Sequence, residues 1–337
     1  MPIPLRKFTS NTGVRIYRIP CQVFESLSAR VYLLVGAGPP TLVDTGSGLG
    51  GATHQILTGL ATIRDEFGER IQPGDIKRII VSHGHVDHIG GLPELLRHTP
   101  AEVAIHPLDA GSVALRREHI AVGNSRLSSF FQQAGVDPVR RAELLKISHF
   151  SGVVVEGVEV GRLLEDGDEL DGLRVIHTPG HSPGHLCIGV GNVLLSADHI
   201  LAVTIPQQWP ESTAAYTGLG HYLESLDKVR DMPGFELTLA AHEQVIDNVY
   251  GRIETIQATH KRRLDRLLGI LGEAHRPMSV HEIAQSLYSE LTGFRAVLAI
   301  TDVGSRVEYL HQRGRLAVVN LDEVENGQNP VFLYGVV

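Results

Sequence analysis

Ser82-His83-Gly84-His85-Val86-Asp87-His88 is the stretch of this sequence that decides the fold. It follows residues 76–82, a short apolar run typical of a fully buried strand. His83 and His85 are two residues apart, so an extended segment presents both on one side. Asp87 and His88 then turn with the chain as the next helix begins. Because neutral imidazoles and carboxylates are ligands of divalent metals such as zinc, this loop can serve two adjacent ions.

Three more candidate ligands occupy the same kind of position, at the end of a predicted strand. His181 follows the strand predicted at 174–178, within Thr178-Pro179-Gly180-His181. Asp198 follows the apolar residues 193–197, and His242 follows residues 237–241. A lone histidine is weak evidence for a metal site, but four segments with ligand residues at strand ends are unlike a chance arrangement.

Short β-branched runs, turn residues and helical patterns alternate through the first 250 residues. Strands are predicted at 13–19, 29–35, 40–44, 76–82, 102–106, 153–160, 174–178, 185–190, 192–196 and 236–241, and helices at 51–67 and 222–230. Gly191-Asn192 suits a two-residue hairpin turn. Residues 108–150 are predicted to form a mainly helical insertion near the pocket of a catalytic domain that spans residues 1–250.

The pattern changes near Gly251, where residues 252–271 form a long amphipathic helical pattern. Ser279 and Glu282 form a predicted capping box at the start of a second helix, 279–288. A third helix is predicted at 295–313, followed by strands at 314–319 and 331–334 around a polar tip. Three helices followed by two strands indicate a winged-helix-like domain over residues 251–337.

The order His-x-His-x-Asp-His, Thr-Pro-Gly-His, strand-terminal Asp and strand-terminal His resembles the metallo-β-lactamase superfamily from about Val14 to Val249. Val43-Asp44-Thr45-Gly46 is similar to the family's early Asp-Thr-Gly turn. The resemblance implies an α+β fold, the αββα sandwich. One departure is Ala240-Ala241-His242-Glu243, because the family usually presents its last histidine between glycines.

The resemblance also implies a ligand set and a mechanism. His83, His85 and His181 would hold one ion. Asp87, His88 and His242 would hold the other, and Asp198 would bridge the two. Asp44 would orient a ligand histidine or its loop. Two divalent ions, Zn²⁺ first and Fe or Mn as alternatives, would activate a water, and Asp87 would help to pass a proton to the leaving group.

Composition narrows the class of protein. The 337 residues carry a net charge of −8, the wrong sign for a protein that grips nucleic acid through phosphates, which disfavours nucleic acid as a partner. Only Cys21 and Cys187 are present, so a disulfide-stapled scaffold is not indicated. The start of the chain does not read as a signal peptide, and no apolar run is long enough to span a bilayer. We expect a cytoplasmic protein without membrane contact, either a monomer or a homodimer.

Three functions stay open at this point. The first is hydrolysis of a small ester, thioester or lactone, because the bridging Asp198 resembles the hydroxyacylglutathione-hydrolase (glyoxalase II) and lactonase branches. The second is an endoribonuclease or phosphodiesterase, because the C-terminal arrangement resembles the lactamase-β-2-like group. The third is an iron-dependent redox enzyme. Side chains that could line a substrate pocket are Phe130, Phe131, His199, Trp209 and Tyr222, although helix-spaced aromatics are usually core.

Overall fold

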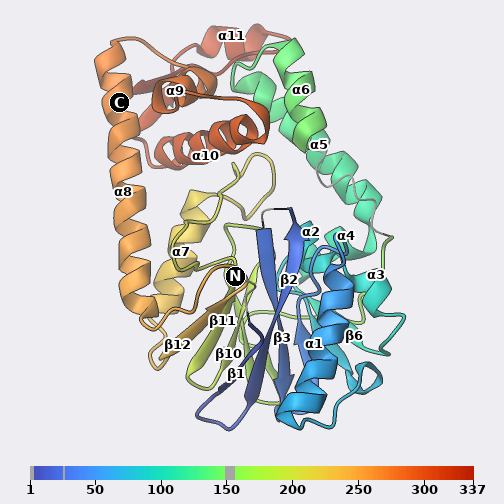
Figure 1. Cartoon of the computed structure of the whole chain (residues 1–337). Helices are drawn as coiled ribbons and strands as arrows, with labels where there is room; N and C mark the ends of the chain where they lie inside the picture. Colours follow the sequence, from blue (N-terminus) through green and yellow to red (C-terminus); the bar gives the residue numbers. More distant parts are fainter. Residues whose placement is uncertain (1–3, 26, 149–155) are drawn as a thin grey trace. The chain divides into compact units, whose positions relative to one another are not determined.

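The computed structural model describes residues 4–25, 27–148 and 156–337 (Figure 1). The chain forms two compact units. The first contains the described residues of Met1–Arg117, Val154–Pro206 and Ser225–Ile253, and the second those of Glu118–Val153, Gln207–Glu224 and Glu254–Val337. Each unit has its own hydrophobic core.

The first sheet of the first unit has seven strands among the described residues, paired in chain order: β1 (Arg6–Thr9), β2 (Arg15–Phe24), β3 (Leu27–Val35), β4 (Thr41–Val43), β5 (Arg78–Ile80), β6 (Glu102–Ile105) and β7 (Arg162–Leu163). The strands from β1 to β4 are antiparallel, and those from β4 to β7 are parallel. The carboxyl ends of β4, β5 and β6 therefore meet at one edge of the sheet. Asp44 and the loop Ser82–His88 lie at that edge.

The second sheet has five strands among the described residues: β8 (Glu169–Leu170), β9 (Leu173–His177), β10 (Leu186–Val190), β11 (Val193–Ala197) and β12 (Leu237–Ala240), in the order β12-β11-β10-β9-β8. The predicted hairpin is confirmed, because Val190 pairs with Val193 across Gly191, whose φ is 57°. β11 and β12 run parallel, and β9 points the same way because both it and β11 are antiparallel to β10. The segments after these three strands therefore leave the sheet at one edge.

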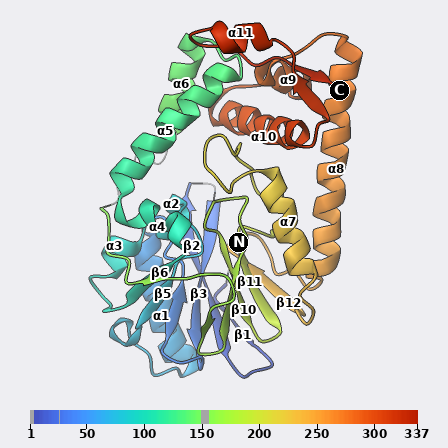
Figure 2. The same ribbon diagram turned by 180° about the vertical axis from the view of Figure 1, so that it is seen from behind.

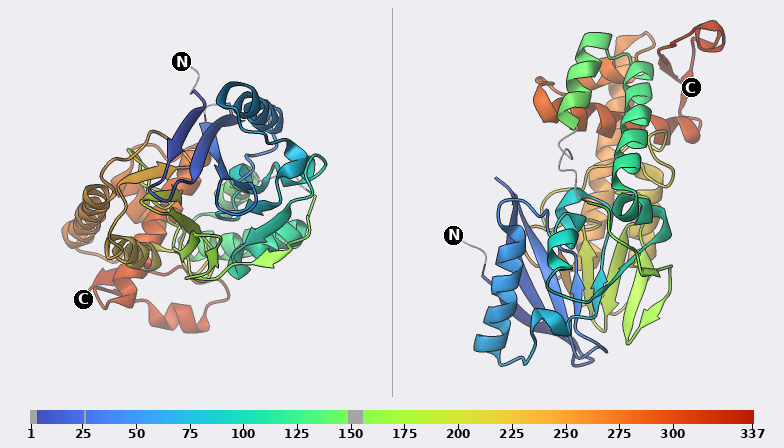
Figure 3. Two further views of the ribbon diagram at one scale, coloured as in Figure 1. Left: turned by 90° about the horizontal axis from the view of Figure 1, so that it is seen from below. Right: turned by 90° about the vertical axis from the view of Figure 1, so that its right-hand side faces the viewer.

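Side chains alternate between two cores as the pleat requires. On β3, Tyr32 and Leu34 face the core between the two sheets, whereas Val31 and Leu33 face the core beneath α1 (Ala52–Phe67). α1 packs so closely on β2 that a Cβ built on Gly59 would lie 2.5 Å from a methyl group of Ile19. Figure 3 shows α1 on the outer side of the first sheet. The second sheet lies on the other side.

Helices also cover the outer side of the second sheet and connect the strands. Figure 2 labels α7 (Leu219–Arg230). Within the first unit, its residues Ser225 and Lys228 donate to the backbone carbonyls of Pro179 and His177. The remaining short helices are η1 (Pro73–Asp75), α2 (Val86–Ile89), α3 (Leu92–Leu95) and α4 (Pro107–Ala114). This order of helix, sheet, sheet and helix confirms the predicted αββα sandwich.

One predicted strand of this unit is wrong. Residues 153–155 of the predicted strand 153–160 lie outside the described residues, and residues 156–160 are irregular. Val158 donates to the carbonyl of Val113 at the end of α4 and packs, with Val160, against the core beneath α1. The alternation in the sequence thus reflects burial on one side of the segment, without a strand ladder.

The second unit contains α5 (Arg116–Gln133) from Glu118 on, α6 (Pro138–Ser148), the part of α8 (Val249–Ala274) from Glu254 on, α9 (Val280–Leu287), α10 (Gly293–Gln312), β13 (Leu316–Val318), α11 (Leu321–Asn326) and β14 (Tyr334–Val336). The predicted capping box is present, since Ser279 and Glu282 bond each other's backbone N–H groups. β13 and β14 pair antiparallel as predicted, although the second strand begins only at Tyr334 and the polar tip contains α11. The winged-helix assignment and the domain boundary near Gly251 stay predictions.

Candidate metal centre

The predicted ligands come together at one edge of the sandwich, within the first unit. Ligand atoms of His83, His85 and His181 all lie within 4.8 Å of one another. The same holds for Asp87, His88 and His242, which form the second predicted triad. Each triad thus combines residues of the loop after β5 with a residue from the second sheet. Sheet packing, rather than local sequence, completes both.

Asp198 lies between the two triads. Its Oδ2 is 3.6 Å from Nε2 of His181, a member of the first triad, and 3.6 Å from Nε2 of His88, a member of the second. Its Oδ1 is 3.4 Å from Nε2 of His242. Oδ2 of Asp87 also lies 3.4 Å from Nε2 of His242. The Asp198 carboxylate therefore occupies the place that a bridging ligand needs.

Burial and charge act together on these groups. Burial lowers the pKa of both His83 and His85, to about 3 for His85, so these imidazoles are neutral. Burial would also lower the pKa of His88 and His242, but the nearby carboxylates outweigh it and raise the pKa of both. In turn, His242 and His88 hold the pKa of Asp198 well below its usual range in spite of burial. A metal binds neutral imidazole and ionised carboxylate, so a bound ion would displace the extra proton that the carboxylates favour on His88 and His242.

Asp44 orients His88 and the loop after β5 through three hydrogen bonds. Its Oδ2 accepts a hydrogen bond from Nδ1 of His88 at 2.8 Å, and its two oxygens accept from the backbone N–H and the hydroxyl of Ser82, also at 2.8 Å. Because a carboxylate only accepts, Nδ1 of His88 carries a proton, and Nε2, which faces Asp87 and Asp198, is the atom that could bind a metal. His242 is oriented in the same way by the carbonyl of Ser28, 2.9 Å from its Nδ1.

The donor atoms fit a divalent cation. Nε2 of His88 and Oδ1 of Asp198 are buried and have no hydrogen-bond partner among the described residues. Leaving such polar atoms unsatisfied costs about 1–3 kcal/mol each. A set of five imidazoles and two carboxylates is the kind that binds zinc or iron. A cation held between these side chains would satisfy the buried atoms.

Four of the five predicted pocket residues belong to the second unit, and their role in a pocket stays a prediction. Phe130 and Phe131 are buried in the core of the second unit, Trp209 packs against that core, and Tyr222 is fully buried in the same unit, its ring 5.6 Å from that of His260. His199 does lie in the first unit, fully buried, with its ring 5.9 Å from that of His185.

Two further residues lie near the ligands: His185, which the sequence indicates as a pocket or supporting residue rather than a ligand, and Asp109, to which it gives no role. His185 accepts a hydrogen bond from the backbone N–H of Asp198 at 3.2 Å, and its Nδ1 lies 2.8 Å from the hydroxyl of Thr178. Asp109, in the first turn of α4, bonds both histidine loops. The signal that could have revealed Asp109 is its place after β6, a third parallel strand that ends at the same edge.

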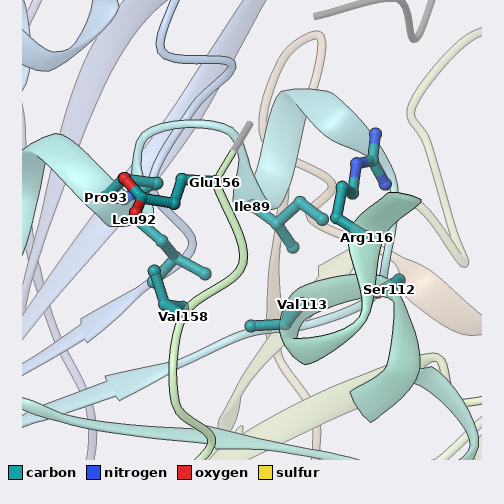
Figure 4. Close-up of a pocket in the computed structure, with 8 residues that line it drawn as sticks. All are labelled: Ile89, Leu92, Pro93, Ser112, Val113, Arg116, Glu156 and Val158. Atoms are coloured by element: carbon teal, nitrogen blue, oxygen red, sulfur yellow. The ribbon is translucent and has the colours of Figure 1, made fainter. Parts of the chain in front are cut away.

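A small cavity lies elsewhere, next to α2, α3 and α4 (Figure 4). Its volume is about 10 Å³, room for about one water molecule. It is lined by Ile89, Leu92, Pro93, Ser112, Val113, Arg116, Glu156 and Val158. No candidate metal ligand lines this cavity, so it is separate from the metal centre.

Comparisons with known proteins agree with this geometry. A model described as the metallo-beta-lactamase superfamily matches residues 27–242. The atrochrysone carboxyl ACP thioesterase AacuM of Aspergillus aculeatus is 25% identical over 79% of this chain and 73% of its own length. The beta-lactamase-like protein 2 homolog of Drosophila melanogaster is 23% identical over 94% of this chain and 93% of its own. A solved metallo-beta-lactamase family protein from Thermus thermophilus is 27% identical, with a TM-score of 0.73 over 96% of this chain and 98% of that one. Within the part of the chain that the structure describes, no helix is both long and apolar enough to cross a bilayer.

Proposed function

The chain belongs to the metallo-β-lactamase superfamily and is a hydrolase, and on that premise we propose that it cleaves a small thioester, ester or lactone with two bound divalent metal ions. The observation that carries the proposal is the carboxylate of Asp198 between two three-residue donor groups, with oxygens within 3.6 Å of His181 and His88 and 3.4 Å of His242. When bound, two ions at such a site lower the pKa of a water and polarise the carbonyl under attack.

The protein's own side chains would prepare the site for that attack. Asp44 and the Ser28 carbonyl keep the Nδ1 protons of His88 and His242 turned away, so both Nε2 atoms face inward. Asp87 lies 3.4 Å from Nε2 of His242, with its pKa held low chiefly by His88 against the effect of burial. An ionised carboxylate there can receive the proton of the attacking water and return it to the leaving group.

A protein nucleophile is less well supported than water. The Ser82 hydroxyl donates to Asp44 and the Ser182 hydroxyl donates to Asp109, so both are engaged by carboxylates that hold the loops. Burial raises the pKa of the Cys21 and Cys187 thiols to about 12, so neither is a thiolate at neutral pH. These engagements favour direct attack by water.

A thioester is the first substrate class to test. The Aspergillus relative is named an atrochrysone carboxyl ACP thioesterase, which supports this choice. A nucleic-acid substrate is disfavoured because the chain has 38 acidic against 30 basic side chains. We propose Zn²⁺ as the first metal to test, with Fe and Mn as alternatives.

The decisive experiment joins metal analysis with a substrate panel of thioesters, esters, lactones, phosphodiesters and RNA. Wild type should bind two ions and turn over an acyl substrate, and chelation should abolish the activity. Asp87→Ala should lower kcat by about 10²–10⁴-fold. Asp75→Ala is the matched control, because Asp75 is an exposed aspartate that caps a remote turn through the backbone of Gln72.

Three results would overturn the proposal in whole or in part. Turnover of RNA alone would exclude an acyl hydrolase. Acyl turnover that survives both chelation and Asp87→Ala would exclude a metal mechanism altogether. A stoichiometry of one ion would exclude the dinuclear form.

A further inference from the structure

Asp109 connects two loops that are far apart in the sequence. Its Oδ2 accepts hydrogen bonds from the backbone N–H of Gly84 at 2.9 Å and from the hydroxyl of Ser182 at 2.8 Å. Its Oδ1 accepts from the backbone N–H of Gly184 at 2.9 Å. The side chain is buried, at 3% exposure, so these bonds replace the hydration that a carboxylate needs.

The bonded groups are the immediate neighbours of the first metal triad. Gly84 lies between His83 and His85, and Ser182 follows His181 directly. Asp109 therefore forms hydrogen bonds with residues that directly neighbour all three histidines in the sequence. The hydrogen bonds go to the backbone and a hydroxyl, and not to the ring nitrogens that would bind an ion. It joins the loop of the first sheet to the loop of the second.

Close approach of the backbone supports this connection. A Cβ built on Gly84 would lie 2.4 Å from the Ser112 hydroxyl oxygen of α4. A Cβ on Gly184 would lie 2.8 Å from the backbone nitrogen of Asp109. Both loops thus press against the first turns of α4 at distances that only glycine permits.

A second contact joins the same segments. His106, the N-cap of α4, accepts from the backbone N–H of Leu108 and stacks on His177, with ring centroids 3.8 Å apart and planes 12° apart. Nε2 of His177 in turn donates to the carbonyl of Pro183, between Ser182 and Gly184. The start of α4 is thereby fixed to the His181 loop through both a carboxylate and a ring stack.

We propose that Asp109 is a positioning residue that sets the separation of the two histidine loops and so determines the affinity of the site formed by His83, His85 and His181. This inference rests on the proposed function, because it assumes that this triad holds an ion. Residues that orient metal ligands from outside typically contribute 10- to 100-fold in metal affinity. Asp109 makes no hydrogen bond next to His88 or His242, so the second ion should be affected less.

Two substitutions separate the contributions. Asp109→Ala removes all three accepted hydrogen bonds and should weaken the first ion about 10- to 100-fold. Asp109→Asn keeps one oxygen but presents an NH₂ group to a backbone or hydroxyl donor, so it should lie between Ala and wild type. Asp75→Ala, which removes an exposed capping carboxylate, should leave both affinities unchanged.

The experiment is a Zn²⁺ titration of the full chain against a chelating competitor, which resolves the two dissociation constants. It is repeated with Co²⁺, whose visible spectrum reports the geometry of its ligands. We expect a selective loss at one of two sites and an altered Co²⁺ spectrum in Asp109→Ala. A substitution that only destabilised the fold would lower the unfolding temperature without changing the ratio of the two affinities.

The outcomes are separable. If wild type binds no ion, the proposed function fails and the inference falls with it. If wild type binds two ions and Asp109→Ala binds both equally well, the inference alone is wrong. If Asp109→Ala does not fold, Asp109→Asn and Ser182→Ala decide, since each removes part of the bond set, and unchanged affinities in both would refute the proposal.

Discussion

Replacing Asp44 by asparagine tests whether a proton on the remote nitrogen of His88 prepares this residue to bind metal. Asp44 accepts from Nδ1 of His88, so Nε2, which faces the other donors, is the nitrogen left to bind a metal. The asparagine side chain has the same size as the aspartate it replaces but can turn its NH₂ group toward that nitrogen. The imidazole would then adopt the other tautomer, with its proton on Nε2, where the metal should bind.

The size of the effect follows from the contacts of Asp44. The substitution leaves one oxygen to bond the backbone N–H of Ser82, so the loop after β5 keeps one of its two anchors. The loss is therefore concentrated on His88. Interactions that orient a ligand contribute about 10- to 100-fold to metal affinity, or about 1.4–2.8 kcal/mol at 25 °C. We expect this loss for the ion held by Asp87, His88 and His242.

The assay is a competitive Zn²⁺ titration of wild type and Asp44→Asn, with circular dichroism to show that both fold alike. Asp44→Ala provides the comparison, because it removes the acceptor without offering a donor to Nδ1. It should weaken the same ion less than asparagine does if the tautomer is the cause. Equal affinities of Asp44→Asn and wild type would refute the tautomer argument.

Three further outcomes follow from the same structure. Burial lowers the pKa of His106 from 6.5 to about 4, so between these pH values the unfolded chain binds a proton at this residue and the folded chain does not. The free energy of unfolding should therefore be highest above pH 6.5 and should decrease as the pH falls toward 4. Urea unfolding at several pH values should show that decline weakened in His106→Asn but retained in His54→Asn, an exposed control on α1. Gly59→Ala should destabilise the protein by about 1–3 kcal/mol, because the new methyl group clashes with Ile19. Gly269→Ala is the control: a Cβ there meets no neighbouring atom within 4 Å, so the substitution should stabilise α8 by up to about 1 kcal/mol. If thermal unfolding gave the reverse order, the packing of α1 on β2 would be wrong. Removal of metal with EDTA should lower the unfolding temperature, and addition of Zn²⁺ should restore it, because ions that bind only the folded chain stabilise it; an unchanged temperature would count against tight binding.

Much of the fold was predictable because each strand carries its own signal. The hairpin at Gly191 combines β-branched runs with a residue that tolerates positive φ, and both signals are local. The strand predicted at 153–160 failed because alternation records only which side of a segment is buried. Whether a neighbouring strand lies within hydrogen-bonding distance depends on the rest of the sheet.

The difference between local signals and contacts of distant segments also explains which parts of the candidate site were predictable. Strand ends and residue chemistry indicated the candidate ligands, because the carboxyl ends of neighbouring parallel strands lie at one edge of a sheet. The role of Asp109 stayed hidden, since its three partners lie 25, 73 and 75 residues away and are two glycines and a serine. The aromatic pair Phe130 and Phe131 shows the converse, because their spacing indicates burial without revealing which core they fill.

The departure from glycine after His242 is explained by the hydrogen bonds of Glu243. Glu243 has a φ of 63°, a conformation that costs a non-glycine residue about 1–2 kcal/mol. Its carboxylate offsets this cost by accepting hydrogen bonds from the backbone N–H groups of Val203 and Thr204, in the segment after Asp198. The residue that replaces glycine thus joins the loop that follows Asp198 to the loop of His242. Because those two loops carry Asp198 and His242, the altered flank of His242 helps to hold these two candidate ligands in place relative to each other.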